Sequence, residues 1–219
     1  MNNLRLEVIK FAKKLNTSNL SPLRSGNISI RTEENGKKGF LITPSGIKYD
    51  QLSEDKIVFL ELDESSNNNK IFKSTLNPSS EWRFHQDIYI NKDDAIAIVH
   101  AHSTHATAVS AHRKNIPAFH YMVALAGGND IKCANYATFG TKELSNNMIL
   151  ALNKRKACLM ANHGQVAFGK NLEEAFELAQ EVENICHQYI NTIKLGTPKI
   201  LSFEEMNKIL EKTKNYKKN

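Results

Sequence analysis

Ala95-Ile96-Ala97-Ile98-Val99-His100-Ala101-His102 is the stretch that decides the fold. Residues 95–101 are apolar and rich in β-branched side chains, which is typical of a strand buried on both faces. His100 and His102 stand two residues apart at its end, and side chains at this spacing on a strand point to the same face. The stretch therefore predicts a buried strand that presents two imidazoles side by side at its end.

Helices and strands alternate around this strand without a regular βαβ rhythm. Alternating or apolar runs predict further strands at 27–31, 39–43, 57–62, 156–161 and 165–168. Helical spacing and helix start and stop signals predict helices at 3–16, 78–90, 103–112, 145–153, 172–193 and 202–214. The polar run 65–69 is expected to be a surface loop, because strand-like sequence resumes at Ile71. The pattern predicts one α/β domain over residues 1–219, with a flexible tail from about 212.

The composition is that of an ordinary globular protein. The 219 residues are 41% hydrophobic and 24% charged, enough for one substantial core. The net charge is +6, but the lysines are scattered, and the one dense basic stretch, 212–218, is typical of a solvated tail. We therefore expect no nucleic-acid partner, and a mild positive excess suits an anionic small substrate.

The cysteines and the lengths of the apolar runs indicate where in the cell the protein is expected. Cys133, Cys158 and Cys186 form no CxxC pair, which favours reduced thiols and a cytoplasmic protein. Residues 1–19 carry lysines among their apolar residues and do not look like a signal peptide. No apolar run approaches the roughly 20 residues that span a bilayer, so we expect no membrane partner.

Three histidines each allow two interpretations. His100 and His102 can chelate a borderline metal such as zinc, or one of them can be a packing residue. His163, in Ala161-Asn162-His163-Gly164 after a buried strand, can be a third ligand or a turn residue bonded to backbone. Three histidine ligands would leave an open coordination position, which is the arrangement of catalytic zinc sites.

A carboxylate and several small-residue turns accompany the histidines. Glu81 opens the helix at 78–90, where it can stabilise the helix dipole or transfer a proton beside a metal. Ser79 and Ser80 precede it and can help to bind an anion at the helix N-terminus. The turns at Ser25-Gly26-Asn27 and Ser45-Gly46 can direct N–H groups at a phosphate, although most such turns are only turns.

Longer motifs, in this order along nearly the whole chain, resemble the class II aldolase/adducin superfamily, and most closely its L-fuculose-1-phosphate aldolase branch. The motifs are Gly26-Asn27-Ile28-Ser29, Ile42-Thr43-Pro44-Ser45-Gly46, Pro78-Ser79-Ser80-Glu81-Trp82-Arg83-Phe84-His85, Val99-His100-Ala101-His102, Ala106-Thr107-Ala108-Val109-Ser110, His120-Tyr121-Met122-Val123-Ala124, Gly127-Gly128-Asn129, Tyr136-Ala137-Thr138-Phe139-Gly140-Thr141 and Asn162-His163-Gly164.

The resemblance implies an α/β fold with a central, mainly antiparallel sheet flanked by helices, and one zinc ion per subunit, with other divalent metals as alternatives. It also implies roles for individual residues. These are His100, His102, His163 and Glu81 at the metal; Glu81 and Tyr121 in proton transfer; Gly26, Asn27, Ser45, Gly46, Ser79 and Ser80 at the substrate phosphate; and Phe139 and Tyr216 on the aldehyde side.

The activity implied by the resemblance is reversible cleavage of a ketose 1-phosphate to dihydroxyacetone phosphate and an aldehyde, through an enediolate held on the metal. The expected substrate is L-fuculose 1-phosphate or a related deoxy or methylthio pentulose 1-phosphate. The expected assembly is a homotetramer with active sites at its interfaces, where Tyr121 serves a neighbouring subunit. Alternatives on the same metal site are a sugar-phosphate 4-epimerase and a methylthioribulose-1-phosphate dehydratase. The non-enzymatic alternative is an adducin-like interaction domain.

Two features depart from the family pattern. Arg24 stands where that aldolase branch has a small hydroxyl residue near the phosphate loop, so it can pair with the phosphate or point to solvent. The basic tail also differs from the usual family ending. Both departures leave the identity of the sugar open.

Overall fold

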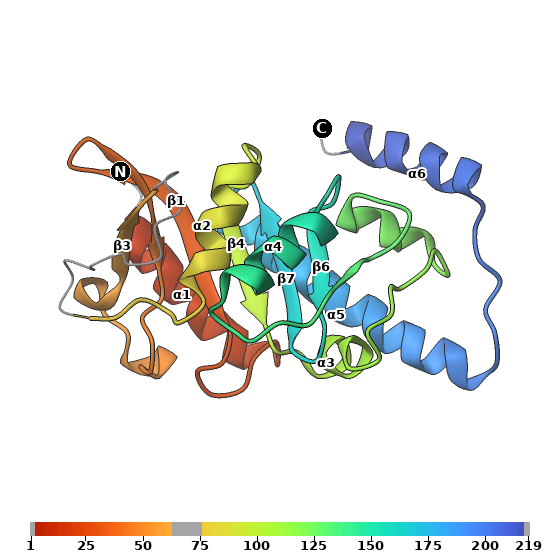
Figure 1. Ribbon diagram of the computed structural model, residues 1–219, viewed down its shortest axis with the longest axis horizontal. Helices are drawn as coiled ribbons and strands as arrows, with labels where there is room; N and C mark the ends of the chain where they lie inside the picture. Colours follow the sequence, from red (N-terminus) through yellow and green to blue (C-terminus); the bar gives the residue numbers. More distant parts are fainter. Residues whose placement is uncertain (1–2, 63–75, 217–219) are drawn as a thin grey trace.

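The computed structural model describes residues 3–62 and 76–216 and is built around one seven-stranded sheet (Figure 1). The order is β3-β2-β1-β4-β7-β6-β5. The strands are β1 (Asn27–Glu34), β2 (Lys37–Ile42), β3 (Val58–Glu61), β4 (Ala97–Ala101), β5 (Cys133–Ala134), β6 (Ala157–Met160) and β7 (Gly164–Gly169). Neighbouring strands are antiparallel except for β5 and β6. The prediction of an α/β fold with a mainly antiparallel sheet is confirmed.

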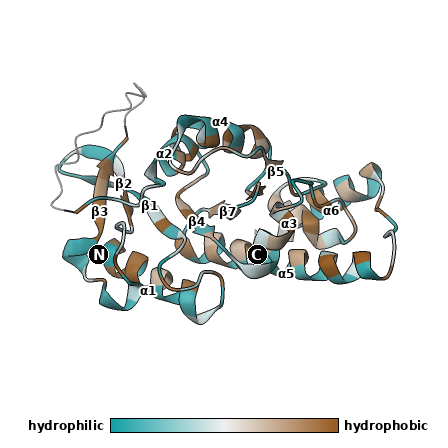
Figure 2. Ribbon diagram, turned by 60° about the horizontal axis from the view of Figure 1, so that its bottom comes forward, coloured by the Kyte–Doolittle hydropathy of each residue, from teal (hydrophilic) through white to brown (hydrophobic). Residues whose placement is uncertain are grey.

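Helices cover both faces of the sheet, which lies between them in Figure 2. One face carries α1 (Leu4–Thr17), α3 (Thr104–Ser110) and α5 (Leu172–Lys194), and the other carries α2 (Trp82–Asn91) and α4 (Lys142–Ala151). Helix α6 (Phe203–Tyr216) packs beside the 3₁₀ helix η3 (Tyr121–Ala126), away from the sheet. Two short 3₁₀ turns, η1 (Tyr49–Gln51) and η2 (Glu54–Lys56), precede β3.

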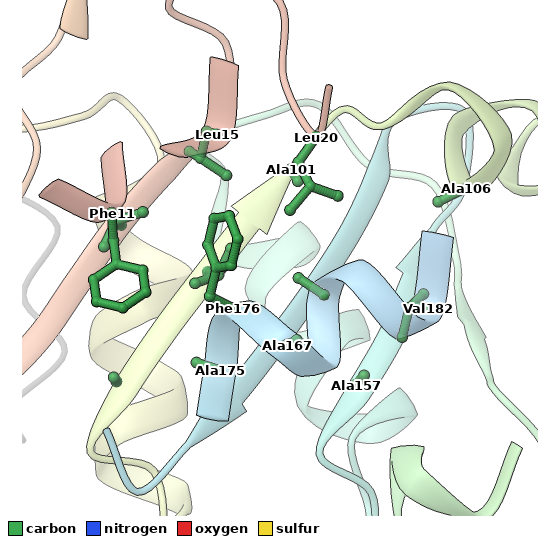
Figure 3. Close-up of a cluster of buried hydrophobic side chains, with 14 of the residues drawn as sticks. Phe11, Leu15, Leu20, Ala101, Ala106, Ala157, Ala167, Ala175, Phe176 and Val182 are labelled. Atoms are coloured by element: carbon green, nitrogen blue, oxygen red, sulfur yellow. The ribbon is translucent and has the colours of Figure 1, made fainter. Parts of the chain in front are cut away.

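Strand β4 divides its side chains between the two cores. Ala97, Val99 and Ala101 face α5, whereas Ile98 and His100 face α2. The face toward α5 is lined largely by alanines, which let the helix pack close to the strands (Figure 3). The Phe11 and Phe176 rings fill the space between α1 and α5, with centroids 5.5 Å apart. This packing fixes the position of the end of β4, where His100 and His102 lie.

Most predicted elements are present, with shifted ends. Helix α2 begins at Trp82 rather than at Pro78, because Pro78 forms a β-bridge with Pro44 and so cannot adopt helical geometry. Helix α6 continues to Tyr216, so the tail predicted from about 212 begins inside it. The two-residue strand β5 and the 3₁₀ helices were not predicted.

Some predictions concern residues outside the described part. The loop predicted at 65–69, and the strand-like sequence expected from Ile71, are among them. No helix in the described ranges 3–62 and 76–216 is both long and apolar enough to cross a bilayer.

Candidate metal centre and substrate pocket

Four side chains expected at a metal converge beside the end of β4. His102 Nε2 lies 2.9 Å from His100 Nε2 and 3.1 Å from His163 Nε2. The Glu81 carboxylate approaches from α2, with Oε2 3.1 Å from His100 Nε2 and Oε1 3.2 Å from His163 Nε2. One ligand atom from each of the four residues lies within 4.8 Å of all the others, a separation that one metal ion can bridge.

The register of the sheet brings these residues together. β4 pairs with β7, so that Ala101 lies opposite Gln165, and the turn between β6 and β7 carries His163 next to His102. Gly164 begins β7, and a Cβ there would lie 2.4 Å from the Ala101 carbonyl oxygen. Only glycine lets the two strand ends approach closely enough for the imidazoles to meet.

His100 is both a packing residue and a member of the cluster. Its ring is fully buried and lies edge-on to Phe84, with centroids 5.4 Å apart. Its Nδ1 lies 2.8 Å from the Gln165 carbonyl oxygen, so Nδ1 carries the proton and donates it there. Burial lowers the pKa of His100, but the Glu81 carboxylate outweighs burial and raises it. A bound cation would displace the Nε2 proton and use the lone pair there, as in metal-binding histidines oriented by a carbonyl.

Glu81 does not act as a helix cap. It occupies the N-cap position of α2, but its side chain makes no capping hydrogen bond and turns instead to His100 and His163. Burial raises the pKa of Glu81, but the charges of the neighbouring His100 and His163 rings outweigh burial and hold that pKa well below its usual range. The carboxylate is therefore ionised at neutral pH.

The cluster has the chemistry of a divalent metal site. Burial lowers the pKa of His102 to about 3, with help from the charges on His100 and His163, so its ring is neutral and can donate a lone pair. Glu81 Oε1 is buried and has no hydrogen-bond partner within the described residues. Nitrogen ligands at about 2.0–2.1 Å in a tetrahedral zinc site lie about 3.3 Å apart, close to the spacing found here. Three imidazoles and one carboxylate thus fit such an ion.

The cluster opens into a cavity of about 390 Å³. Phe139 lines it together with all six residues expected at the phosphate: Gly26, Asn27, Ser45, Gly46, Ser79 and Ser80. Asn27 is nevertheless buried, and its side-chain Nδ2 donates to Ser79 Oγ and Glu81 Oε2, each at 3.0 Å. The predicted anion turns and the candidate metal centre therefore share one cavity.

The residues that line this cavity without an assigned role include Tyr136, Asn162 and Arg24. Arg24 Nη1 donates to the Gly46 carbonyl oxygen at 3.1 Å, which links the two glycine turns. Arg24 is the one lysine or arginine that lines the cavity among the described residues. The sequence already distinguished Arg24, because it departs from the family pattern at this position.

Two predicted residues are not placed at the cavity. Tyr121 lies in η3, half exposed, and does not line the cavity of its own chain. Tyr216 ends α6, and its side chain lies outside the described part. Both roles remain predictions.

Comparison with known proteins gives concordant matches. Residues 6–190 match the family described as Class II Aldolase and Adducin N-terminal domain. The chain is 44% identical to the L-fuculose phosphate aldolase of Escherichia coli (strain K12) over 216 residues, covering 98% of this chain and 96% of the relative. It is 43% identical to a 5-methylthioribulose-1-phosphate/5-deoxyribulose-1-phosphate aldolase of Rhodospirillum rubrum, covering 97% and 92%. A solved structure of L-fuculose 1-phosphate aldolase superposes with a TM-score of 0.88 at 39% identity, covering 98% of this chain and 97% of that one.

Proposed function

The chain belongs to the class II aldolase and adducin family, and from that membership we propose that it cleaves a ketose 1-phosphate to dihydroxyacetone phosphate and an aldehyde. Its relatives are aldolases, which are lyases, and the chain is an enzyme of this class. The observation that carries the proposal is the meeting of three imidazoles and a carboxylate at the wall of a cavity lined with anion-binding turns.

The turns hold the phosphate end of the substrate. The Ser45 and Ser79 amides donate to backbone carbonyls, and Ser79 Oγ accepts from Asn27, so the Ser45 and Ser80 hydroxyls and the other N–H groups of the turns are the candidates for contacting the phosphate. Arg24 adds a positive charge at the same rim and can form charge-assisted hydrogen bonds to a phosphate oxygen. Binding at this end places the carbonyl end of the ketose toward the histidine cluster.

His100, His102, His163 and Glu81 would hold the cation. When bound, a divalent cation supplies Lewis-acid stabilisation for the negative charge that develops on the substrate oxygens as the carbon–carbon bond breaks. Glu81 moves the proton at the nucleophilic carbon of dihydroxyacetone phosphate, because it is ionised and lies at the cavity wall. Phe139 lines the side that receives the aldehyde.

The finer assignments are proposals of the same kind. We propose zinc as the metal, since three histidines and a carboxylate are ligands that zinc accepts. We also propose a homotetramer, in which Tyr121 transfers a proton in the site of a neighbouring subunit and Tyr216 reaches the aldehyde side. The unpaired cysteines support a cytoplasmic location. The matching relatives support L-fuculose 1-phosphate or a deoxy or methylthio pentulose 1-phosphate as substrate.

The test is a screen of pentulose and hexulose 1-phosphates, with enzyme-coupled detection of dihydroxyacetone phosphate. Purified protein should release this product from at least one ketose, lose the activity after chelation, and regain it with zinc. Full activity in verified metal-free protein would contradict the proposal. Formation of an isomer would indicate an epimerase, and loss of water a dehydratase. A protein that binds no metal and is not rescued by zinc would be an adducin-like interaction domain.

A further inference from the structure

Five polar side chains form a continuous hydrogen-bonded chain inside the protein, behind Glu81. Asn27 Nδ2 lies 3.0 Å from Glu81 Oε2, and His85 Nε2 contacts Asn27 Oδ1. Ser29 Oγ lies 2.7 Å from both His85 Nδ1 and Tyr89 Oη. All five residues are at most 7% exposed. Buried polar groups destabilise a protein unless each is paired, so such a chain persists only if its members satisfy one another.

The direction of each hydrogen bond follows from the carboxylate. Glu81 is acceptor-only, so the Asn27 amide must turn its NH₂ group toward Glu81 and its carbonyl toward His85. That carbonyl only accepts, so His85 carries its proton on Nε2 and accepts at Nδ1 from the Ser29 hydroxyl. Ser29 has then given its only proton, so Tyr89 donates to Ser29. His85 is thereby held in one tautomer.

The fixed tautomer of His85 determines how Asn27 contacts Glu81. Because the His85 ring donates to Asn27 Oδ1, it keeps the Asn27 amide from turning over. A reversed amide would present its carbonyl oxygen to the Glu81 carboxylate. Glu81 Oε2 stays anchored by Asn27, while Oε1 lies 3.2 Å from His163 Nε2 and accepts no hydrogen bond from residues 3–62 and 76–216. His85 does not line the cavity, so it can influence the reaction only through Asn27.

We propose that His85 is a positioning residue for the reaction: it fixes the orientation of the Asn27 amide, and Asn27 holds Glu81 by Oε2, so that Oε1 is the oxygen that exchanges a proton with the substrate. The inference rests on the proposed role of Glu81 in proton transfer. Its basis is a buried hydrogen-bond chain with a single consistent direction, and every group between Tyr89 and Glu81 is needed to maintain that direction.

The test compares three variants of the metal-loaded enzyme. His85→Leu removes both ring nitrogens and should lower kcat about 10–100-fold, the usual effect of losing an outer-shell partner. KM should change by less than about threefold, because the substrate contacts remain. His85→Gln should recover most of the loss, since its amide can still donate to Asn27. Ser29→Ala keeps the ring but frees the tautomer, and should give a smaller loss than His85→Leu.

A matched control removes an unrelated buried hydrogen bond from the same helix. Ser145 Oγ donates to Asp87 Oδ2 of α2 at 2.6 Å, and both residues are buried. Ser145→Ala should lower the melting temperature without changing kcat. The readouts are metal content per folded subunit, kcat and KM, and the exchange of hydrogen between dihydroxyacetone phosphate and D₂O, which reports the proton transfer directly.

The outcomes separate the two proposals. If the wild-type protein releases dihydroxyacetone phosphate from no ketose 1-phosphate, the proposed function and this inference both fail. Only the inference is overturned if the wild type is active and the His85→Leu variant, folded and loaded with metal, exchanges hydrogen at the wild-type rate. Equal losses in the Gln and Leu variants would also overturn it. If His85→Leu does not fold, wild-type exchange in Ser29→Ala has the same meaning, and a loss there supports the inference.

Discussion

Glu81 begins α2 without capping it, because its carboxylate lies between His100 and His163. From the sequence, its position allowed both a helix-dipole role and a proton-transfer role, since local pattern alone cannot distinguish them. In the structure the carboxylate joins the histidine cluster instead of capping the helix, through contacts with residues that follow Glu81 by many positions, and proton transfer stays a proposal. The sequence contains a signal for His85, because this residue stands four positions after Glu81 in the same motif, the spacing of neighbours on a helix.

Glu81→Gln should separate metal binding from proton transfer. The three histidines remain, so the variant should still bind a divalent cation, whereas the loss of the proton-accepting oxygen should lower kcat about 10²–10⁴-fold. Deuterium exchange into dihydroxyacetone phosphate measures the proton transfer, and metal analysis of the same sample provides the control. Exchange at the wild-type rate would remove Glu81 from this role.

Arg24→Met should weaken substrate binding more than catalysis. Charge-assisted hydrogen bonds contribute about 1.5–3 kcal/mol, so KM for the ketose phosphate should rise at least about tenfold while kcat changes little. Lys48→Met removes an equal charge close to Gly46 but outside the cavity lining, and should leave KM unchanged. Steady-state kinetics at low and high salt measure both. An unchanged KM in Arg24→Met would show that this arginine only links the two turns.

At the scale of the elements, periodicity predicted what each segment is but not where it lies. The spacing of apolar residues gave α1, α5 and the strand at 95–101 to within a few residues, because burial of one face or of both leaves a period in the sequence. The strand order β3-β2-β1-β4-β7-β6-β5 leaves no such period. The meeting of His163 with His102 depends on the pairing of β4 with β7, which was not predicted. The local pattern left the role of His163 open, and the family resemblance implied that it joins the other two histidines. Strand β5 is two residues long and too short to show a pattern.

Gly164→Ala should disturb the metal centre through the sheet. Its methyl group would lie 2.4 Å from the Ala101 carbonyl oxygen, so β7 must move away from β4 and carry His163 with it. We expect a loss of about 1–3 kcal/mol of stability from the overpacking, together with weaker metal binding.

Gly36→Ala is the control for that change. Gly36 has a φ of +73° and nothing within 4 Å of an added Cβ, so alanine there brings strain without a clash. It should cost roughly 1–2 kcal/mol and leave metal affinity intact. Chemical denaturation and metal titration of both variants measure the two effects. Wild-type metal affinity in Gly164→Ala would contradict the account of the strand ends.

At the scale of the whole molecule, the candidate metal centre connects segments that are far apart in the chain. Glu81 comes from the start of α2, His100 and His102 from the end of β4, and His163 from the turn before β7. A cation bound there would connect the end of β4 and the turn before β7 to the start of α2. Metal binding and folding should therefore be coupled, because the unfolded chain has no such site.

Removal of the metal should lower the melting temperature. A cation at 100 times its Kd stabilises the folded state by about 2.7 kcal/mol, which for a domain of this size corresponds to roughly 5–10 °C. Calorimetry before and after chelation measures the shift, and added zinc should reverse it. His102→Asn lacks one ligand and should respond much less. A melting temperature insensitive to chelator and zinc would argue against a resident metal.

The central claim is that His100, His102, His163 and Glu81 bind one catalytic divalent cation. Anomalous diffraction at the zinc absorption edge, from crystals of active zinc-loaded protein, tests it most directly. We predict a single strong peak per subunit within about 2.0–2.2 Å of the Nε2 atoms of all three histidines. A peak elsewhere in the molecule, or none at this position in protein that cleaves the substrate, would contradict the account.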